Sequence, residues 1–376
     1  MKKIGMLSFH DSLSFGGTLQ CYALQTVLKK QGYDAEFINF RRHECTDSKV
    51  KEVKVGIKEQ IKSKIIYFVQ TAQGYLTRKN DNAVSQKFDN FKQNNIAIGK
   101  RKYTSMQSLY DDVPEYDIYM TGSDQVWNPN SDFLKVYGLG FVPEEKNTIA
   151  YGASIGVTEI PKEREDYLKN NIKKTRHMSC REYEGALALE KLLGREVKNV
   201  LDPTLLLTKE EWEKKAKPID IPEKYVLGFF LGSLDYPRKA AKKIADANGC
   251  KLLIIPGSPV DIFTKGKYVK GCGPAEFLYL FKHAEFICTD SFHGTAFSIN
   301  LQKNFYAFCR RGYNEKSSYI SRLKDLVEIL GISERLIYPD SNIDEKITKI
   351  DYEPVKKKLE HCRKLSIDFL TEALSD

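Results

Sequence analysis

Long apolar runs are missing from this sequence, and so are the cysteine patterns that hold metal ions. No segment approaches the roughly 18 uncharged apolar residues that a membrane span needs. The apolar stretch at the N-terminus is interrupted by His10 and Asp11 before it reaches the length of a signal-peptide core. The eight cysteines form no C-x-x-C pair and no Cys/His spacing suited to zinc. We therefore expect a cytoplasmic protein with reduced cysteines and no metal site.

The composition is that of a globular protein rather than a disordered one. Apolar residues make up 41% of the 376 positions and charged residues 29%, which leaves enough apolar side chains for a large core. At roughly 150 residues per domain, the length predicts at least two domains. The net charge of +9 favours an anionic partner. Nucleic acid is not expected, because the positive charge is thinly spread and accompanies no RNA- or DNA-binding motif.

Strand and helix patterns alternate along most of the chain. A strand over 3–9, a helix through Leu19 and Val27, and a strand over 34–40 predict a βαβ unit. A second alternation begins with the apolar segment 225–231. We therefore expect an α/β protein with two facing Rossmann-like domains and a ligand cleft at the carboxyl ends of their strands. The other predicted strands are 116–121, 148–152, 176–180, 197–201, 252–255, 286–289 and 305–309, and the other predicted helices are 162–174, 182–193, 238–247, 274–282 and 294–301.

The predicted organisation has an N-terminal Rossmann-like domain at 1–207, a C-terminal one at 208–340, and a helix within 341–376 that packs back on the first domain. A basic helical insertion interrupts the first domain at about 50–102. Apolar residues from Val50 to Phe68 alternate there with lysines. This stripe suits either packing on the sheet or a peripheral contact with an anionic membrane at its inner face.

The segment Cys288–Thr295 falls where a buried strand passes into a helix. A helix N-terminus disfavours an imidazolium and favours a bound anion, so His293 suits acid/base chemistry beside a phosphate. A histidine that only caps or packs is the alternative interpretation.

Two further loops follow predicted strands. In Gly122–Pro129, Ser123, Asp124, Gln125 and Asn128 supply hydrogen-bonding groups, and Trp127 either offers a face for a sugar or is buried. Phe15–Thr18 contains Gly16 and Gly17 where phosphate-binding loops occur, but it lacks a G-x-G-x-x-G or Walker pattern. A plain helix start explains this loop equally well.

Basic residues stand at other strand ends. Arg181 would project into the cleft, where its planar guanidinium suits a carboxylate or phosphate, unless it forms an ordinary ion pair with Glu182 or Glu184. Arg310, Arg311, Lys316 and Arg322 form a basic cluster after the strand 305–309. We interpret Asp202 in Asp202-Pro203-Thr204 as a structural strand exit, and His10 has no assigned role.

Six segments, in order, resemble the polysaccharide pyruvyltransferase family, and the resemblance runs from about His10 to Gly331. It implies a fold like that of the two-domain GT-B glycosyltransferases. The segments are FGGTLQCYALQ (15–25), TGSDQVWNP (121–129), YGASIG (151–156), SCREYEG (179–185), LDPTLLL (201–207) and TDSFHGTAFSI (289–299).

The resemblance also implies an activity: transfer of pyruvate from phosphoenolpyruvate to a sugar hydroxyl pair, as a ketal, during synthesis of a capsule or exopolysaccharide. Phosphoenolpyruvate is then a co-substrate, no other cofactor is expected, and the acceptor is a sugar that a lipid diphosphate can carry. His293 becomes the catalytic acid or base, and Arg181 helps to hold phosphoenolpyruvate. The expected donor-binding residues are Arg181, Ser291, Gly294, Arg310, Arg311 and Arg322, and the expected acceptor-binding residues are Gly16, Gly17, Ser123, Asp124, Gln125 and Asn128.

The chain departs from some relatives at position 291, where they carry arginine and this chain has Ser291. The missing cation must come from Arg310, Arg311, Lys316 or Arg322, or the donor differs. Two other functions therefore stay open: a GT-B-type glycosyltransferase that uses a nucleotide sugar, and a glycan-binding relative without activity.

Overall fold

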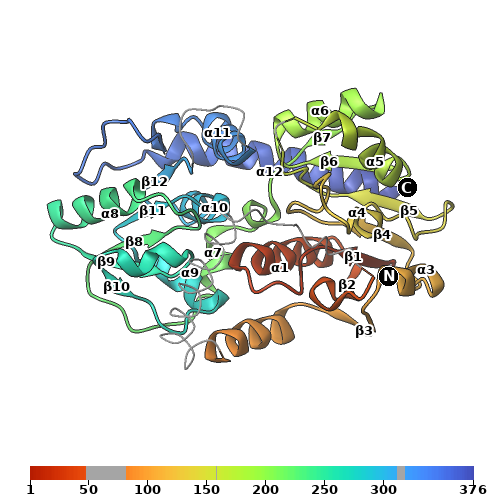
Figure 1. Cartoon of the computed structure of the whole chain (residues 1–376), viewed down its shortest axis with the longest axis horizontal. Helices are drawn as coiled ribbons and strands as arrows, with labels where there is room; N and C mark the ends of the chain where they lie inside the picture. Colours follow the sequence, from red (N-terminus) through yellow and green to blue (C-terminus); the bar gives the residue numbers. More distant parts are fainter. Residues whose placement is uncertain (48–81, 158, 311–317) are drawn as a thin grey trace, which may run out of the picture.

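The computed structural model describes residues 1–47, 82–157, 159–310 and 318–376. These residues form two lobes, each built on a parallel sheet with helices against it (Figure 1). The first sheet has the strand order β3-β2-β1-β4-β5-β6-β7, and the second has the order β10-β9-β8-β11-β12-β13. Every neighbouring pair of strands is parallel. The predicted α/β fold with two Rossmann-like domains is confirmed.

The first sheet contains β1 (Lys3–Leu7), β2 (Asp34–Phe40), β3 (Ile98–Tyr103), β4 (Ile118–Thr121), β5 (Asn147–Ala150), β6 (His177–Cys180) and β7 (Lys198–Asn199). Its helices are α1 (Phe15–Lys30), a helix over 82–95, α3 (Met106–Asp111), α4 (Leu134–Tyr137), α5 (Lys162–Ile172) and α6 (Tyr183–Leu193).

The second sheet contains β8 (Tyr225–Phe229), β9 (Lys251–Ile255), β10 (Lys267–Tyr268), β11 (Phe286–Thr289), β12 (Phe305–Phe308) and β13 (Leu336–Ile337). The remaining helices are α7 (Lys209–Glu213), α8 (Tyr236–Ala247), α9 (Pro274–His283), α10 (Phe292–Asn300), α11 (Ser318–Leu330) and α12 (Tyr352–Ser375).

The central strands are buried along their whole length, which explains their continuous apolar sequences. All five residues of β8 and all four of β11 and β12 are buried, as expected when helices cover both faces of a parallel sheet. In both sheets the strand order reverses after the first strand, between β1 and β4 and between β8 and β11. Ligands of such folds bind at this switch point, outside the carboxyl ends of the strands.

The structure differs from the sequence prediction in the basic segment at 50–102. Its last residues form β3, which pairs with β2 at the edge of the first sheet. Three successive charged residues, Lys100, Arg101 and Lys102, are exposed there. Such charges are typical of an edge strand and hide the alternation that marks a half-buried one. The stripe from Val50 to Phe68 lies outside the described residues.

The terminal helix α12 runs from the second lobe to the first (Figure 1). Near its C-terminal end, Asn147 of β5 donates a hydrogen bond to the carbonyl of Ala373 at 2.8 Å. The middle of α12 contacts the linker, the segment 200–224 between the last strand of the first sheet and the first strand of the second. Ser366 accepts a hydrogen bond from the amide of Leu201 at 3.0 Å, and Arg363 donates to the carbonyl of Leu205 at 2.6 Å.

The linking segment is also held by α10. The side-chain amide of Asn300 donates to the carbonyls of Thr204 and Leu207 at 2.8 and 2.9 Å, and its oxygen accepts from Arg363 at 3.2 Å. This buried amide therefore connects α10, α12 and the linker.

We predict that Asn300→Ala lowers the free energy of unfolding by about 1–2 kcal/mol, because hydrogen bonds to buried carbonyls are lost. Urea unfolding followed by circular dichroism measures the change. Asn94→Ala is the matched control, since Asn94 is exposed and its amide donates to the carbonyl of Asn90 in its own helix. Equal changes in the two variants would contradict the proposed role of Asn300.

Candidate active site

His293 lies in the first turn of α10, directly after β11. Ser291 caps this helix, and its hydroxyl accepts a hydrogen bond from the amide of Gly294 at 3.3 Å. A Cβ at Gly294 would lie 2.3 Å from Oγ1 of Thr289, so only glycine permits this tight turn. Ser291 and Gly294 thus position His293 from the end of a buried strand.

The His293 ring contacts the other lobe at Gly16. A Cβ at Gly16 would lie 2.0 Å from Nδ1 of His293. Gly16 belongs to the first turn of α1, which Ser14 caps. The N-termini of two helices, one from each lobe, therefore meet at this imidazole. Both helix dipoles favour negative charge at that point.

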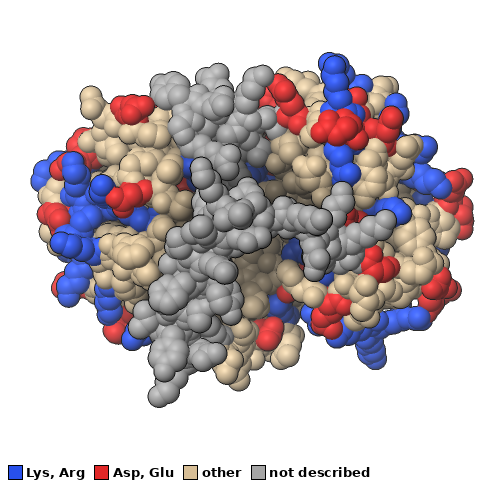
Figure 2. All heavy atoms as spheres, in the orientation of Figure 1, with Lys and Arg blue, Asp and Glu red and all other residues tan. Residues whose placement is uncertain are grey.

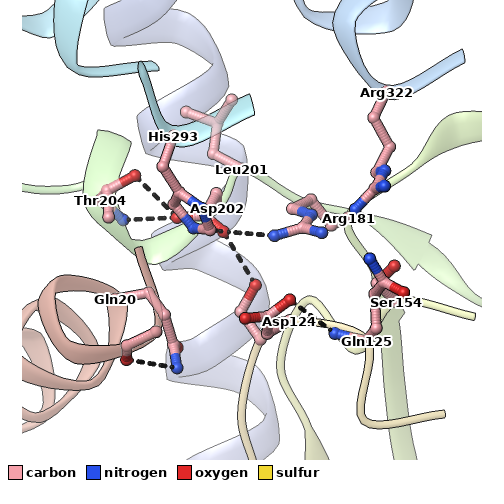
Figure 3. A network of polar contacts seen from close by, with 12 residues as sticks. Gln20, Asp124, Gln125, Ser154, Arg181, Leu201, Asp202, Thr204, His293 and Arg322 are labelled. Atoms are coloured by element: carbon pink, nitrogen blue, oxygen red, sulfur yellow. Dashed lines mark hydrogen bonds and ion pairs between the residues drawn. The ribbon is translucent and has the colours of Figure 1, made fainter. Parts of the chain in front are cut away.

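Asp202, in the linker between the sheets, joins His293 to Arg181 (Figure 3). Its Oδ2 atom lies 2.8 Å from Nη1 of Arg181 and 3.6 Å from Nε2 of His293. The Asp202 side chain is fully buried, and that of Arg181 is 3% exposed. A buried carboxylate here lies between a histidine from one lobe and an arginine from the other.

Hydroxyl groups complete the surroundings of Asp202. Ser123, after β4, donates to Oδ2 at 3.0 Å. The amide and hydroxyl of Thr204 donate to Oδ1 at 3.0 and 2.7 Å. Burial raises the pKa of Asp202, but His293 and Arg181 outweigh it and hold that pKa well below its usual range. Asp202 is therefore ionised.

Arg181 lies between two carboxylates. Besides Asp202, its Nε donates to Oε1 of Glu182 at 3.2 Å, and its guanidinium lies 4.5 Å from the ring centre of Phe292. Burial lowers the pKa of Arg181, but the charges of Glu182 and Asp202 outweigh burial, so the pKa lies above its usual value. Its Nη2 atom is buried and has no hydrogen-bond partner among the described residues, and the same holds for Nε2 of His293. Among the described residues, Nη2 of Arg181 thus makes no hydrogen bond, and Nε2 of His293 approaches Oδ2 of Asp202 at 3.6 Å.

A cavity of about 480 Å³ adjoins Arg181, Asp202 and Phe292. Its charged lining comprises two arginines and four carboxylates: Arg181, Arg322, Glu182, Asp202, Asp325 and Glu328. Burial raises the pKa of Asp325 to about 6. Negative charge predominates in this lining. Groups that attract anions are instead concentrated at the His293 ring, where the two helices begin.

The other expected donor residues lie in different surroundings. Arg322 approaches Glu182 at 3.9 Å and so belongs to the Arg181 cluster. Arg310 donates to the carbonyl of Asp290 at 2.9 Å, at the ends of β11 and β12. Arg311 and Lys316 lie outside the described residues.

The expected acceptor residues divide into two groups. Gly16 and Ser123 contact His293 and Asp202, as described above, whereas Gly17 lies against the loop before α1. Asp124 has a φ of +80° and accepts a hydrogen bond from the amide of Gln125 at 2.9 Å. Gln125 and Asn128 face Gly156, where a Cβ would lie 2.6 Å from Oε1 of the first and 3.1 Å from Nδ2 of the second.

Trp127 is not available as a face for a sugar. Its side chain is fully buried, and its indole nitrogen donates to the carbonyl of Tyr137 at 3.1 Å. The stacking interpretation is therefore wrong. The apolar ring fills the core beneath α4, where its N–H group finds a backbone acceptor.

Asp202 is the residue of this site that the sequence interpretation missed. The signal was an aspartate directly after a predicted strand, in LDPTLLL. A proline after an aspartate also marks an ordinary strand exit, and the caps of η2 (Pro203–Leu205) indeed use Oδ1 of Asp202. Only the fold reveals that Oδ2 faces His293 and Arg181.

Among the described residues, no group of three His, Cys, Asp or Glu side chains is arranged to hold a metal ion. In the same part of the chain, none of the helices combines the length and apolarity that crossing a bilayer requires. Figure 2 shows lysines and arginines over both lobes of one face, interspersed with acidic residues.

A solved structure with low sequence identity shares this fold, and others are more distantly similar. UDP-GlcNAc 2-epimerase from Methanocaldococcus jannaschii is 12% identical, with a TM-score of 0.55 over 96% of this chain and 92% of that one. The enzyme of that name from Neisseria meningitidis is 10% identical, with a TM-score of 0.48 over 99% and 100% of the two chains. A spinosyn rhamnosyltransferase is 10% identical, with a TM-score of 0.41 over 100% and 92%.

No curated protein matches the sequence. A family model does: residues 15–309 match that of polysaccharide pyruvyl transferase. This range includes Gly16, Arg181, Asp202 and His293, which the structure brings together. The chain therefore belongs to the polysaccharide pyruvyl transferase family.

Proposed function

We propose that this protein transfers the pyruvyl group of phosphoenolpyruvate to two hydroxyl groups of a sugar and forms a ketal. The methylene carbon of the enol takes a proton and becomes a methyl group. One sugar hydroxyl attacks the adjacent carbon, phosphate leaves, and a second hydroxyl closes the ring. Of the two hydroxyl protons, one replaces the proton given to the methylene carbon and the other leaves with the phosphate. The reaction needs a proton donor and groups that stabilise the leaving phosphate.

The observation that carries this proposal is the placement of His293 and Arg181, one from each lobe, on either side of the buried Asp202 carboxylate. His293 is the proton donor in this proposal, because its ring lies where the two lobes meet, with Nε2 3.6 Å from the Asp202 carboxylate. Arg181 offers Nη2 to the carboxylate or phosphate of the donor. The N-termini of α1 and α10 add favourable dipoles. These groups compensate for the absence of a cation at Ser291, whose hydroxyl caps α10.

The acceptor belongs on the first lobe in this proposal. Gln125 and Asn128, at the carboxyl end of β4, present amides that suit sugar hydroxyl groups. A sugar carried on a lipid diphosphate is one form of this acceptor, and the protein would then work at the inner face of the membrane.

We predict that His293→Ala lowers phosphate release from phosphoenolpyruvate, in the presence of acceptor glycans, by about 10²–10⁴-fold, the usual contribution of a positioned acid or base. Phosphate release and product mass are measured together. His361→Ala is the matched control, because His361 is an exposed histidine on α12. Circular dichroism verifies that both variants fold.

Two outcomes would contradict this function. Undiminished turnover by the His293 variant excludes the proton-donor role. Thermal stabilisation by nucleotide sugars, with none by phosphoenolpyruvate, indicates a glycosyltransferase instead.

We predict that Gly16→Ala lowers kcat by about 10²-fold without unfolding the protein, because the added methyl group must displace the His293 ring, and small displacements of reacting groups have effects of this size. Gly17→Ala is the matched control in the same turn. Its Cβ would meet no atom closer than 3.5 Å. Steady-state kinetics compare the two variants, and equal kcat values would show that the contact between Gly16 and His293 does not matter for the reaction.

A further inference from the structure

Another cavity, of about 450 Å³, lies where the helix over 82–95 of the first lobe meets α9 of the second (Figure 1). Residues of the linker just after α7 complete its lining. An ion pair of 2.8 Å between Lys87 and Glu276 crosses there from one lobe to the other. Among the described residues, this cavity shares no lining residue with the one beside Arg181. We call it the lysine cavity, and a molecule inside it would contact both lobes.

Positive charge predominates around the lysine cavity. Glu276 is already engaged, because its Oε1 atom pairs with Lys87 and its Oε2 atom accepts a hydrogen bond from the amide of Gly273 at 3.0 Å. Ammonium groups gathered around one hollow repel each other, and a bound anion replaces that repulsion by attraction. The lining therefore favours an anionic ligand. Its charged residues are four lysines and one glutamate, which leaves a net charge of +3: Lys87, Lys214, Lys215, Lys217 and Glu276.

Two of the four lysines have ammonium groups that are available to a ligand. Lys214 and Lys217 are exposed, and neither ammonium group makes a hydrogen bond or an ion pair with the described residues. The chain around them is nevertheless fixed. The amide of Lys217 donates to the carbonyl of Ala275 in α9 at 3.0 Å, and Nζ of Lys215 donates to Oδ1 of Asn95 at 2.8 Å. The two ammonium groups thus belong to a fixed segment and are not neutralised there.

Side-chain amides line much of the remaining surface of the lysine cavity. Asn90, Asn94 and Asn95 present them from the helix over 82–95. Such amides both donate and accept hydrogen bonds, which suits sugar hydroxyl groups. In the described part of the lining, only Phe91 and Ala275 are apolar, so the cavity does not suit a hydrocarbon chain. Its volume is typical of small-molecule sites. A phosphorylated sugar matches the charge, the amides and the size.

The lysine cavity is connected to the catalytic site through aromatic residues. Phe15, next to Gly16 at the start of α1, stacks on Phe277 of α9 with 4.6 Å between ring centres. Its ring centre also lies 5.1 Å from that of Phe88, on the first-lobe helix of the cavity. A ligand between these two helices would therefore stabilise the arrangement of the lobes in which Gly16 contacts His293.

We propose that the lysine cavity binds a phosphorylated sugar, whose phosphate contacts the ammonium groups of Lys214 and Lys217 and whose hydroxyl groups contact Asn90 and Asn94. Lysine suits a phosphate because its compact charge carries three donors and needs no fixed orientation. This site is additional to the proposed catalytic site and does not depend on the reaction there. Free sugar phosphates and sugars on a lipid diphosphate share the recognised chemistry.

Charge substitutions in the lining test the site without disturbing the core. The double variant Lys214→Gln with Lys217→Gln removes two charges at exposed positions. The matched control is Lys162→Gln with Lys169→Gln, which removes two charges from exposed lysines of α5. Asn90→Asp introduces a carboxylate of nearly equal size into the lining. Circular dichroism and thermal unfolding verify the fold of each variant.

Isothermal titration calorimetry at low ionic strength, where charges are little screened, measures the binding of glucose 1-phosphate, N-acetylglucosamine 1-phosphate, inorganic phosphate and geranyl diphosphate. We expect the wild-type protein to bind at least one sugar phosphate, and to bind it more tightly than inorganic phosphate. The double variant and Asn90→Asp should bind that sugar phosphate about tenfold more weakly. The α5 control and His293→Ala should bind it as the wild type does.

Failure of this site is distinguishable from failure of the proposed function. The site is refuted if neither sugar phosphate binds, or if the folded double variant binds them as the wild type does. If geranyl diphosphate alone binds, and the double variant loses it, the ligand is a lipid diphosphate and the sugar assignment is wrong. If a sugar phosphate binds as expected but phosphoenolpyruvate is never turned over, the site stands and the pyruvyl-transfer proposal falls.

Discussion

A fully buried carboxylate dominates the organisation of this protein. Removing the charge of Asp202 from water is costly unless charged partners and hydrogen-bond donors replace the water. This role is fulfilled by Arg181 from the loop after β6, His293 from α10, Ser123 from the loop after β4, and Thr204 from the linker itself. Residues of both lobes therefore have to contact this one charge. This requirement brings a histidine and an arginine close to each other.

The two sheets make this arrangement possible. In each sheet the strand order reverses after the first strand, so the loops at the carboxyl ends of two neighbouring strands diverge and leave room for side chains and ligands. Because α1 and α10 both begin at such ends, their N-termini meet at the His293 ring, with Gly16 providing the space. The linker is held in turn by Asn300 and by α12, which extends across both lobes.

Local sequence was informative where one element passes directly into the next. Cys288–Thr295 placed His293 at a helix start, and Gly16 was assigned to a strand-to-helix turn, because burial, capping and turn formation leave local patterns. The same reasoning failed for Trp127, because the sequence of a polar loop does not distinguish an aromatic residue that faces a sugar from one that is buried in the core. The sequence patterns also missed β3, whose exposed charges lack the alternation typical of a strand.

The sequence alone was enough to predict the α/β class, the two domains and the residues at the strand ends. Periodicity and turn chemistry act over a few neighbouring positions and therefore leave local patterns. Only the tertiary structure decided that Asp202 lies between His293 and Arg181 and that Gly16 of one lobe contacts the imidazole of the other. Those contacts join residues far apart in the chain, and whether a carboxylate is a strand exit or a buried counterion depends on which atoms the other lobe brings to it.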